Sequence, residues 1–436
     1  MKLQCTIQLP ASKSESNRAL MIAAYGGFNA DFQNLSDSND TQILLDVLRG
    51  LPSIDSIANP PTRLRNDIGG NLRIIDIADC GTAARFLTTF LAFYTGSWLL
   101  TGTDRMKQRP IKPLVDALRG LGADIQYAEN EGFLPLIIEG KPISGGKVQI
   151  DMSQSSQFAS SLLLAAPMWE KGLEMELLGE LSSLPYLDMT LSIMRHFGAD
   201  AERRDRTVVV NPTPYQPRSF TVSADWSAAS YWYEMAALSE ECFIRLNGLG
   251  GRRFDRLSDL PDLEPVERQA FIQSDAVVAE WMKPLGVNTI EDGDSLVLQK
   301  APFEKRPLHF DFSAHPDLFP TMAATCAGLQ VEARFSGISN LHVKESDRVE
   351  AMKTELAKIG VEMDQITNDE VVLHPVSQLP YYHPSCPLAF AAHDDHRVVM
   401  SLAPLTLRVG AVRFDRPQVV EKSYPQFWSD ASFLLP

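Results

Sequence analysis

The sequence predicts an α/β protein that is built from a repeated unit, and two observations support this. First, an apolar-periodic helix, a glycine, a strand, a polar turn and a second strand follow one another four times along the chain. Second, the glycines recur at intervals of 76, 88 and 74 residues, at Gly122, Gly198, Gly286 and Gly360. Each stands where the end of a helix needs a left-handed residue. A unit of about 75 residues fits nearly six times into the chain.

Five further segments are expected to be helices, because each opens on a small polar residue, Gly or Pro and continues as an apolar run. They are residues 14–26, 81–96, 155–169, 225–238 and 316–329. Free N–H groups at helix N-termini bind anions. Several openings carry or adjoin a basic residue, namely Lys13, Arg18, Arg85, Arg348 and Arg397. The openings are therefore candidate anion sites.

Composition limits the class of protein. A length of 436 residues allows two to four domains, of which two is the expected number. The formal net charge of −15 and the lack of a long basic run argue against nucleic-acid binding, although a local basic cluster can still bind anionic substrates. The most apolar stretch, residues 86–100, is too short to cross a bilayer, so no membrane association is expected.

The cysteines and the start of the chain indicate the compartment. Five cysteines without CxxC spacing argue against a disulfide scaffold or a zinc ribbon and favour a reducing compartment. The first 16 residues contain no apolar leader segment. We therefore expect a cytoplasmic protein.

The segment HDDHR, residues 393–397, resembles a set of metal ligands. His393 and His396 can meet on one helix face, yet no further cluster completes a tetrahedral set, so no metal is expected. Cys80 precedes a helix whose dipole can lower the pKa of a thiol, but small-residue packing is the favoured interpretation.

Basic and hydroxyl residues gather in short polar strings between apolar helices. The strings cover residues 10–18, 105–113, 153–158, 340–348, 368–375 and 420–427. Singly, each is typical of a solvated loop. Together they suit a ligand that carries two or more phosphate or carboxylate groups, because Arg binds such oxygens bidentately without a metal.

The chain resembles the 5-enolpyruvylshikimate-3-phosphate synthase family. The strings PASKSESNRAL, DCGTAARFL, RMKQRP, SQSSQF, KESDR, DHR and KSYP occur in the order seen in that family, from about residue 10 to residue 428. The resemblance implies an enolpyruvyl transferase fold of the inside-out α/β barrel type, with six βαβαββ repeats. It also implies three repeats in a domain of residues 10–222, three in a domain of residues 1–9 plus 223–436, and an active site in the cleft between them.

The implied reaction transfers the enolpyruvyl group of phosphoenolpyruvate to the 5-hydroxyl of shikimate 3-phosphate and releases phosphate. It belongs to the shikimate pathway, which leads to chorismate and the aromatic amino acids. Two small anionic substrates, a monomer and no cofactor are expected.

Site residues follow from the resemblance, position by position. The implied catalytic residues are Lys13, Asp317 and Glu345. Those implied for phosphoenolpyruvate are Lys13, Gly81, Arg109, Gln157, Arg348, Arg397 and Lys422. Those implied for shikimate 3-phosphate are Lys13, Ser14, Arg18, Ser155, Ser156, Gln157, Ser183, Tyr186, Asp317, Asn340 and Lys344.

The chain departs from the family pattern at three positions. Asp79 and Cys80 replace the usual Asn-Ala, and Leu184 stands where many members have Lys or Arg. We interpret Asp79 as the N-cap of the helix that begins near Gly81; the alternative is a carboxylate that repels phosphoenolpyruvate.

Two other functions stay open at this point. The related enolpyruvyl transferase that acts on UDP-N-acetylglucosamine typically has a Cys in the loop where this chain reads RMKQRP, and no Cys occurs there. A non-catalytic anion-binding paralogue is the third interpretation. The presence of Lys13, Asp317 and Glu345 argues against it.

Overall fold

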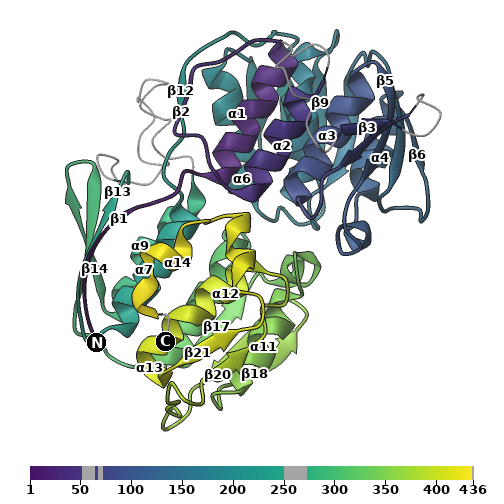
Figure 1. Cartoon of the computed structure of the whole chain (residues 1–436). Helices are drawn as coiled ribbons and strands as arrows, with labels where there is room; N and C mark the ends of the chain where they lie inside the picture. Colours follow the sequence, from purple (N-terminus) through teal and green to yellow (C-terminus); the bar gives the residue numbers. More distant parts are fainter. Residues whose placement is uncertain (52–63, 67–71, 250–272, 435–436) are drawn as a thin grey trace. The chain divides into compact units, whose positions relative to one another are not determined.

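The computed structural model describes residues 1–51, 64–66, 72–249 and 273–434, which form two compact units (Figure 1). The central unit is Lys13–Val222, and the terminal unit contains Met1–Ser12 and the described residues from Ser223 onward. The chain passes between the units after Ser12 and after Val222. Within the terminal unit the two crossings pair, because the N–H of Ser12 donates to the carbonyl of Ser223 at 2.8 Å.

The described residues of the central unit form six helices: α1 (Lys13–Gly26), α2 (Asn39–Arg49), α3 (Gly81–Phe93), α4 (Lys112–Gly120), α5 (Ser156–Ala165) and α6 (Leu184–His196). Its described strands are β2 (Phe32–Gln33), β3 (Leu64–Asn66), β4 (Arg73–Asp76), β5 (Gly96–Thr101), β6 (Asp124–Tyr127), β7 (Leu136–Gly140), β8 (Gly146–Asp151), β9 (Leu173–Leu178), β10 (Ala201–Arg204), β11 (Thr207–Val210) and β12 (Phe220–Thr221).

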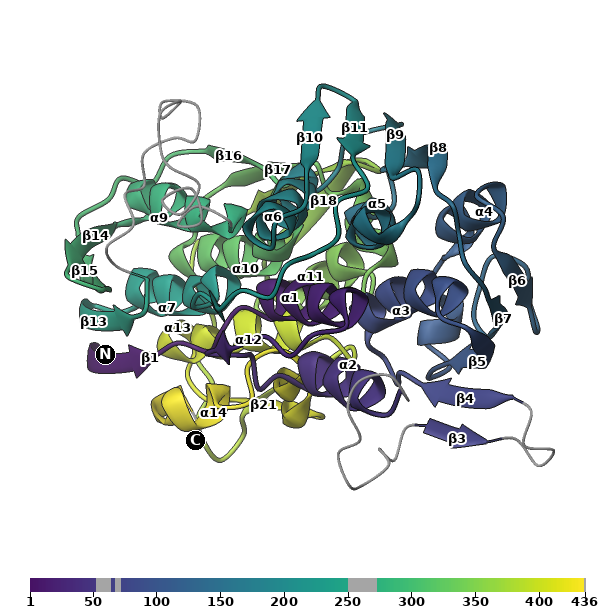
Figure 2. The same ribbon diagram turned by 90° about the horizontal axis from the view of Figure 1, so that it is seen from above.

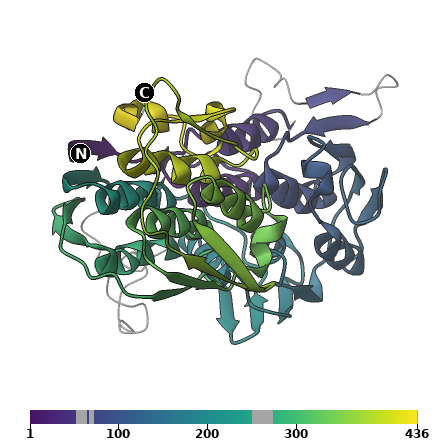
Figure 3. The same cartoon turned by 90° about the horizontal axis from the view of Figure 1, so that it is seen from below.

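The terminal unit contains the described helices α7 (Trp226–Leu238), α9 (Val278–Trp281), α10 (Phe319–Leu329), α11 (Arg348–Ala357), α12 (His396–Leu402), α13 (Thr406–Val409) and α14 (Phe427–Asp430). Its strands are β1 (Lys2–Gln8), β13 (Glu241–Asn247), β14 (Val287–Asp292), β15 (Ser295–Lys300), β16 (Leu308–Asp311), β17 (Ala333–Ser336), β18 (Glu362–Thr367), β19 (Glu370–His374), β20 (Leu388–Phe390) and β21 (Val412–Phe414). Within this unit the strand β1, drawn in purple at the N-terminus, lies close to the yellow C-terminal part of the chain (Figure 3).

One sheet topology occurs four times among the strands that the structure describes. In each copy the first two strands are parallel, and the third and fourth form a hairpin whose last strand pairs with the second. The sheet orders are β4-β5-β7-β6, β8-β9-β11-β10, β1-β13-β15-β14 and β16-β17-β19-β18, with β3 added at the edge of the first. Two further sheets, β2-β12 and β20-β21, keep only a parallel pair. The described sheets are open, and the α/β fold with repeated βαβαββ units is confirmed.

The four glycines mark these repeats as predicted. Gly122, Gly198, Gly286 and Gly360 have φ between 82° and 95° and precede the four hairpins. A residue with a Cβ is strained in this conformation, so glycine ends each helix at low cost.

Apolar periodicity explains how the helices cover the sheets. The strand β9 alternates between buried and exposed residues, as expected for a sheet with one covered face. The helix α10 is buried along its whole length, with Phe319 packed edge-to-face on Phe312 and Phe335 beneath it. Figure 2 shows α10 and α11 beside the sheet of β16 to β19. None of the described helices is both long and apolar enough to span a membrane.

Candidate active site

In the terminal unit, the buried Arg348 gathers three carboxylates. It is the first residue of α11, and its side chain is 1% exposed. Its Nε donates to Asp395 at 2.9 Å, Nη1 to Asp317 at 2.8 Å and Nη2 to Glu345 at 2.9 Å. Burial alone lowers the pKa of Arg348, but the three negative charges outweigh burial and raise it. A planar guanidinium with fixed donors therefore holds both carboxylates for which the sequence predicts catalysis.

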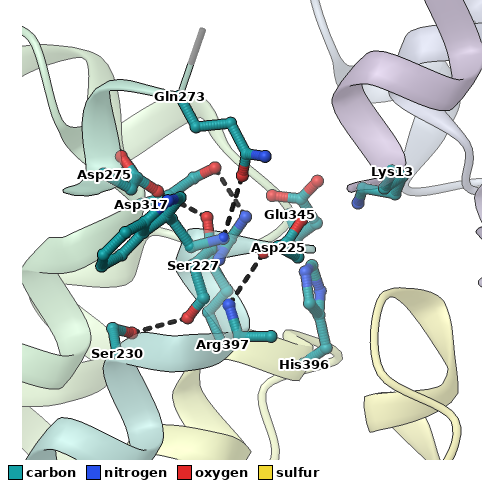
Figure 4. A network of polar contacts seen from close by, with 12 residues as sticks. Lys13, Asp225, Ser227, Ser230, Gln273, Asp275, Asp317, Glu345, His396 and Arg397 are labelled. Atoms are coloured by element: carbon teal, nitrogen blue, oxygen red, sulfur yellow. Dashed lines mark hydrogen bonds and ion pairs between the residues drawn. The ribbon is translucent and has the colours of Figure 1, made fainter. Parts of the chain in front are cut away.

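Asp317 bridges two arginines. Its Oδ1 accepts from Arg348. Its Oδ2 accepts from Nη2 of Arg397 at 2.6 Å (Figure 4). Burial favours the neutral carboxyl, yet the charges of Arg397 and Arg348, with Lys344 behind them, hold the pKa of Asp317 well below its usual value. The group is therefore ionised here, and it is a weak base as long as both arginines stay on it.

The HDDHR segment forms the turn that positions Arg397. Asp395 is the N-cap of α12, and its Oδ1 accepts the N–H of Arg397 at 2.9 Å. His393 turns away and contacts Glu355 at 2.9 Å, while His396 is buried. Among the described residues, no group of three or more His, Cys, Asp or Glu could hold a metal ion.

Three further predicted ligands belong to this unit. Asn340 lies buried in a short 3₁₀ turn, Lys344 follows that turn, and Lys422 is buried at the end of the turn Pro417–Lys422. Lys344 directly precedes Glu345 in the chain, which places this lysine near the carboxylates. The terminal unit thus brings Asp317, Glu345, Arg348 and Arg397 into direct contact, with Lys344 nearby.

In the central unit, Lys13 forms an ion pair with Asp40. The Nζ–Oδ2 distance is 3.0 Å, and the side chain of Asp40 is 4% exposed. Lys13 is the first residue of α1, and Asp40 lies in the first turn of α2. The carboxylate fixes the position of the ammonium group.

The guanidinium of Arg18 donates hydrogen bonds to other groups of the central unit. Its Nε donates to Thr190 at 2.7 Å, its Nη1 to the carbonyl of Ser14 at 2.9 Å, and its Nη2 to the carbonyl of Tyr186 at 3.2 Å and to Ser160 at 3.5 Å. Burial lowers the pKa of Arg18 to about 10. Since an arginine has five N–H donors, at most one is left for a ligand.

Gly81 and Arg109 are in close contact. A Cβ at Gly81 would lie 2.6 Å from Nη1 of Arg109, so the guanidinium rests on a surface that only glycine offers. Arg85 supports the arrangement from behind, since it donates to the carbonyls of Gly81 at 3.1 Å and Pro110 at 3.0 Å.

The predicted phosphate ligands lie at two helix N-termini. Ser155 caps α5, with its Oγ accepting the N–H of Gln157 at 3.2 Å. Ser156 opens the same helix, and the Gln157 amide reaches Thr82 at 3.2 Å. Ser183 precedes α6 with φ 57°, and Tyr186 lies in the first turn of that helix.

The interpretation of Asp79 as an N-cap is wrong. The structure has Cys80 at the N-cap of α3, where its Sγ accepts the N–H of Ala83 at 3.3 Å. The bend at Ala78, with φ 49°, places Asp79 one residue before the cap. Cys80 is buried, as the packing interpretation expects. Leu184 is simply the first residue of α6.

Sequence reasoning missed two residues of these clusters. Asp395 appeared only as a possible metal ligand, although its position two residues before Arg397 in an N-cap pattern was a usable signal. No sequence signal pointed to Asp40, because it lies 27 residues from Lys13 and on a different helix.

Solved structures define the class of fold. The chain matches an EPSP synthase from Acinetobacter baumannii with a TM-score of 0.69 and 21% identity, covering 99% of this chain and 96% of the other. It matches the enolpyruvyl transferase NikO from Streptomyces tendae with a TM-score of 0.69 and 16% identity, covering 99% and 95%. At these identities the likeness concerns the fold, which is that of the enolpyruvyl transferases.

Sequence comparison then gives the family. The model of the family EPSP synthase (3-phosphoshikimate 1-carboxyvinyltransferase) matches residues 1–430. A 3-phosphoshikimate 1-carboxyvinyltransferase from Bacteroides fragilis (strain YCH46) is 40% identical over 98% of this chain and 95% of its own length. One from Haemophilus influenzae (strain PittEE) is 35% identical over the same shares. The chain belongs to the EPSP synthase family.

Proposed function

We propose that this chain transfers the enolpyruvyl group of phosphoenolpyruvate to the 5-hydroxyl of shikimate 3-phosphate, with release of phosphate. Family membership supports the reaction. The observation that carries it in the structure is the bridge of Arg348 and Arg397 across Asp317, with Glu345 on the same guanidinium. Two fixed cations beside two carboxylates suit acid–base chemistry on an anionic substrate.

Glu345 and Asp317 divide the proton transfers in this proposal. Glu345, in its protonated form, gives a proton to C3 of phosphoenolpyruvate while the 5-hydroxyl oxygen forms a bond to C2. Asp317, with Lys13, takes the hydroxyl proton. The resulting tetrahedral ketal then loses a C3 proton to Glu345, and the C2–O bond to the phosphate breaks, so that phosphate leaves with the bonding electrons.

The arginines link substrate binding to basicity. With both guanidiniums on Asp317, the pKa of this carboxyl is far below that of a useful base. When the phosphate and carboxylate of phosphoenolpyruvate attract Arg348 and Arg397, Asp317 loses part of its compensating charge and its pKa rises. Binding thus activates the base.

We further propose that residues of both units bind the same two substrates. Lys13, Gly81, Arg109, Gln157 and Lys422 join the arginines on phosphoenolpyruvate. The residues proposed for shikimate 3-phosphate are Lys13, Ser14, Arg18, Ser155, Ser156, Gln157, Ser183, Tyr186, Asp317, Asn340 and Lys344. The active protein is proposed to be a cytoplasmic monomer, consistent with its five free cysteines.

One assay tests the reaction. Phosphate release from phosphoenolpyruvate is measured with shikimate 3-phosphate, with UDP-N-acetylglucosamine and without an acceptor. Of these three conditions, only the one with shikimate 3-phosphate is expected to release phosphate. Release with the nucleotide sugar would reassign the acceptor, and no release with either would favour an anion-binding protein.

A further inference from the structure

The N-terminus of α7 is a helix opening to which the proposed function assigns no residue. Proposed ligands lie at or next to the openings of α1, α3, α5, α10 and α12. The segment 225–238, which forms α7, was expected from its sequence to be the same kind of anion site. Within its repeat, α7 is the helix between the two parallel strands β1 and β13, the same place that α3, α5 and α10 take in the other three repeats.

The N-cap residue and two side chains from another segment close this helix end. Asp225 caps it, accepting the N–H of Ala228 at 2.8 Å, and Gln273 accepts the N–H of Trp226 at 2.9 Å. Ser227, in the first turn, donates its hydroxyl to Oδ2 of Asp275 at 2.5 Å (Figure 4).

Asp275 is a buried carboxyl group with an unused oxygen. The residue is 3% exposed, and its Oδ1 has no hydrogen-bond partner in the described part of the chain. The charged groups that act on it are the carboxylate of Asp317, the guanidinium of Arg397 and the carboxylate of Asp225. An unpaired polar atom in such a place calls for an explanation.

The neighbours of Asp275 decide when it is charged. Burial above all, and then the negative charge of Asp317, raise the pKa of Asp275 to about 7; Ser227 and Arg397 oppose the rise. His315, two residues before Asp317, adds no positive charge near neutral pH, because burial lowers its pKa to about 4. Asp275 therefore changes charge near neutral pH.

We propose that Asp275, held by Ser227 at the start of α7, is a positioning residue that sets the charge beside Asp317 and makes phosphoenolpyruvate binding depend on pH. This rests on the proposed function. When Asp275 is neutral, it does not compete for Arg397, which can then bind to Asp317 and to the substrate. Ionised Asp275 adds a second negative charge, which competes for Arg397 and repels the anionic substrate.

The test compares the KM for phosphoenolpyruvate from pH 6 to pH 9 in the wild type, D275N and S227A, at saturating shikimate 3-phosphate. The wild-type KM is expected to rise with pH more than that of D275N, by about tenfold, which corresponds to one pKa unit of coupling. Ionisation of the substrate itself is common to all variants and cancels in the comparison.

S227A gives an independent check. The Ser227 hydroxyl stabilises the ionised carboxylate, so its loss raises the pKa of Asp275 further and moves the rise in KM to higher pH. The exposed Asp205 provides a matched control, and D205N should follow the wild type. If D275N shows the same pH dependence as the wild type, or if S227A moves the rise to lower pH, the proposal is wrong.

A second readout does not need turnover. The infrared difference between the wild type and D275N should show a protonated carboxyl band at pH 6 that disappears by pH 8. Absence of the band at pH 6 would overturn the role of Asp275. Absence of phosphate release at every pH, with the band present, would instead overturn the proposed reaction and, with it, the link to substrate binding.

Discussion

Nη2 of Arg397 lies 2.6 Å from Oδ2 of Asp317, and the other oxygen of this carboxylate is bound to Arg348. The proposed base is thus fully paired in the structure. Its stabilisation of the folded state depends on pH, because the pKa of Asp317 is lower in the folded chain than in the unfolded one.

Asp317→Asn is expected to destabilise the protein at pH 7. Removal of one member of a buried ion pair leaves two buried arginines short of charge and costs roughly 3 kcal/mol. The depressed pKa means that the wild-type advantage is full above the unfolded pKa of about 4, begins to decline below it and is lost as the pH falls through the lower folded pKa. Urea unfolding at pH 7 and at pH 3 measures this. A stability difference that does not shrink at pH 3 would contradict it.

Glu345→Gln should cut turnover by about 10²–10⁴-fold, the range for loss of a general acid or base. The amide keeps an oxygen that can accept the hydrogen bond from Arg348, so shikimate 3-phosphate binding should change little. Steady-state kinetics and calorimetric binding separate the two effects. A fall of less than tenfold would exclude Glu345 as the acid.

Gly81→Ala is expected to raise the KM for phosphoenolpyruvate more than that for shikimate 3-phosphate. The added methyl carbon would lie 2.6 Å from Nη1 of Arg109, which is too close, so the guanidinium would have to move. Arg109→Ala is the matched comparison. It should weaken the binding of phosphoenolpyruvate by about 1.5–3 kcal/mol, which is one to two decades in affinity. Equal weakening of both substrates in the two variants would indicate a distorted loop.

Cys80→Ala should lower the free energy of unfolding by about 1 kcal/mol, since it removes the acceptor for the N–H of Ala83. Cys80→Ser keeps an acceptor and should retain most of the stability. Thermal unfolding of the two variants decides whether the thiol acts as a cap. Equal melting temperatures for Ala and Ser would show that it does not.

Asp79→Asn tests the charge of this residue without disturbing the cap, because Cys80 holds that position. A neutral amide near the helix N-terminus should change the melting temperature little. The alternative interpretation, a carboxylate that repels phosphoenolpyruvate, predicts a KM for this substrate that falls severalfold while the KM for shikimate 3-phosphate is unmoved. Parallel kinetics on both substrates distinguish these outcomes.

The repeat could be predicted from the sequence because it depends on local chemistry. Gly122 and Gly360 end helices through their own backbone freedom, and the hairpins follow directly along the chain. The helix that begins at Gly81 was also predicted, but its cap was assigned one residue too early, since Asp is the commoner cap and the bend at Ala78 has no sequence signal.

The contacts that organise the candidate site are of another kind. Arg348 reaches Asp395 across 47 residues, and Lys13 reaches Asp40 across 27. Such pairs depend on how repeats pack, which a single sequence does not reveal. The pairing of Ser227 with Asp275 across 48 residues was missed for the same reason.

Arg18 ties α1 to α5 and α6 through Thr190, Ser160 and the carbonyl of Tyr186. A lysine has no fork with which to replace these bonds. Substitutions of Arg18 and Thr190 should therefore be non-additive, since either one removes the hydrogen bond that the two side chains share. Over evolutionary time the pair is expected to change together or not at all, and a tolerated replacement at one position would need its counterpart at the other.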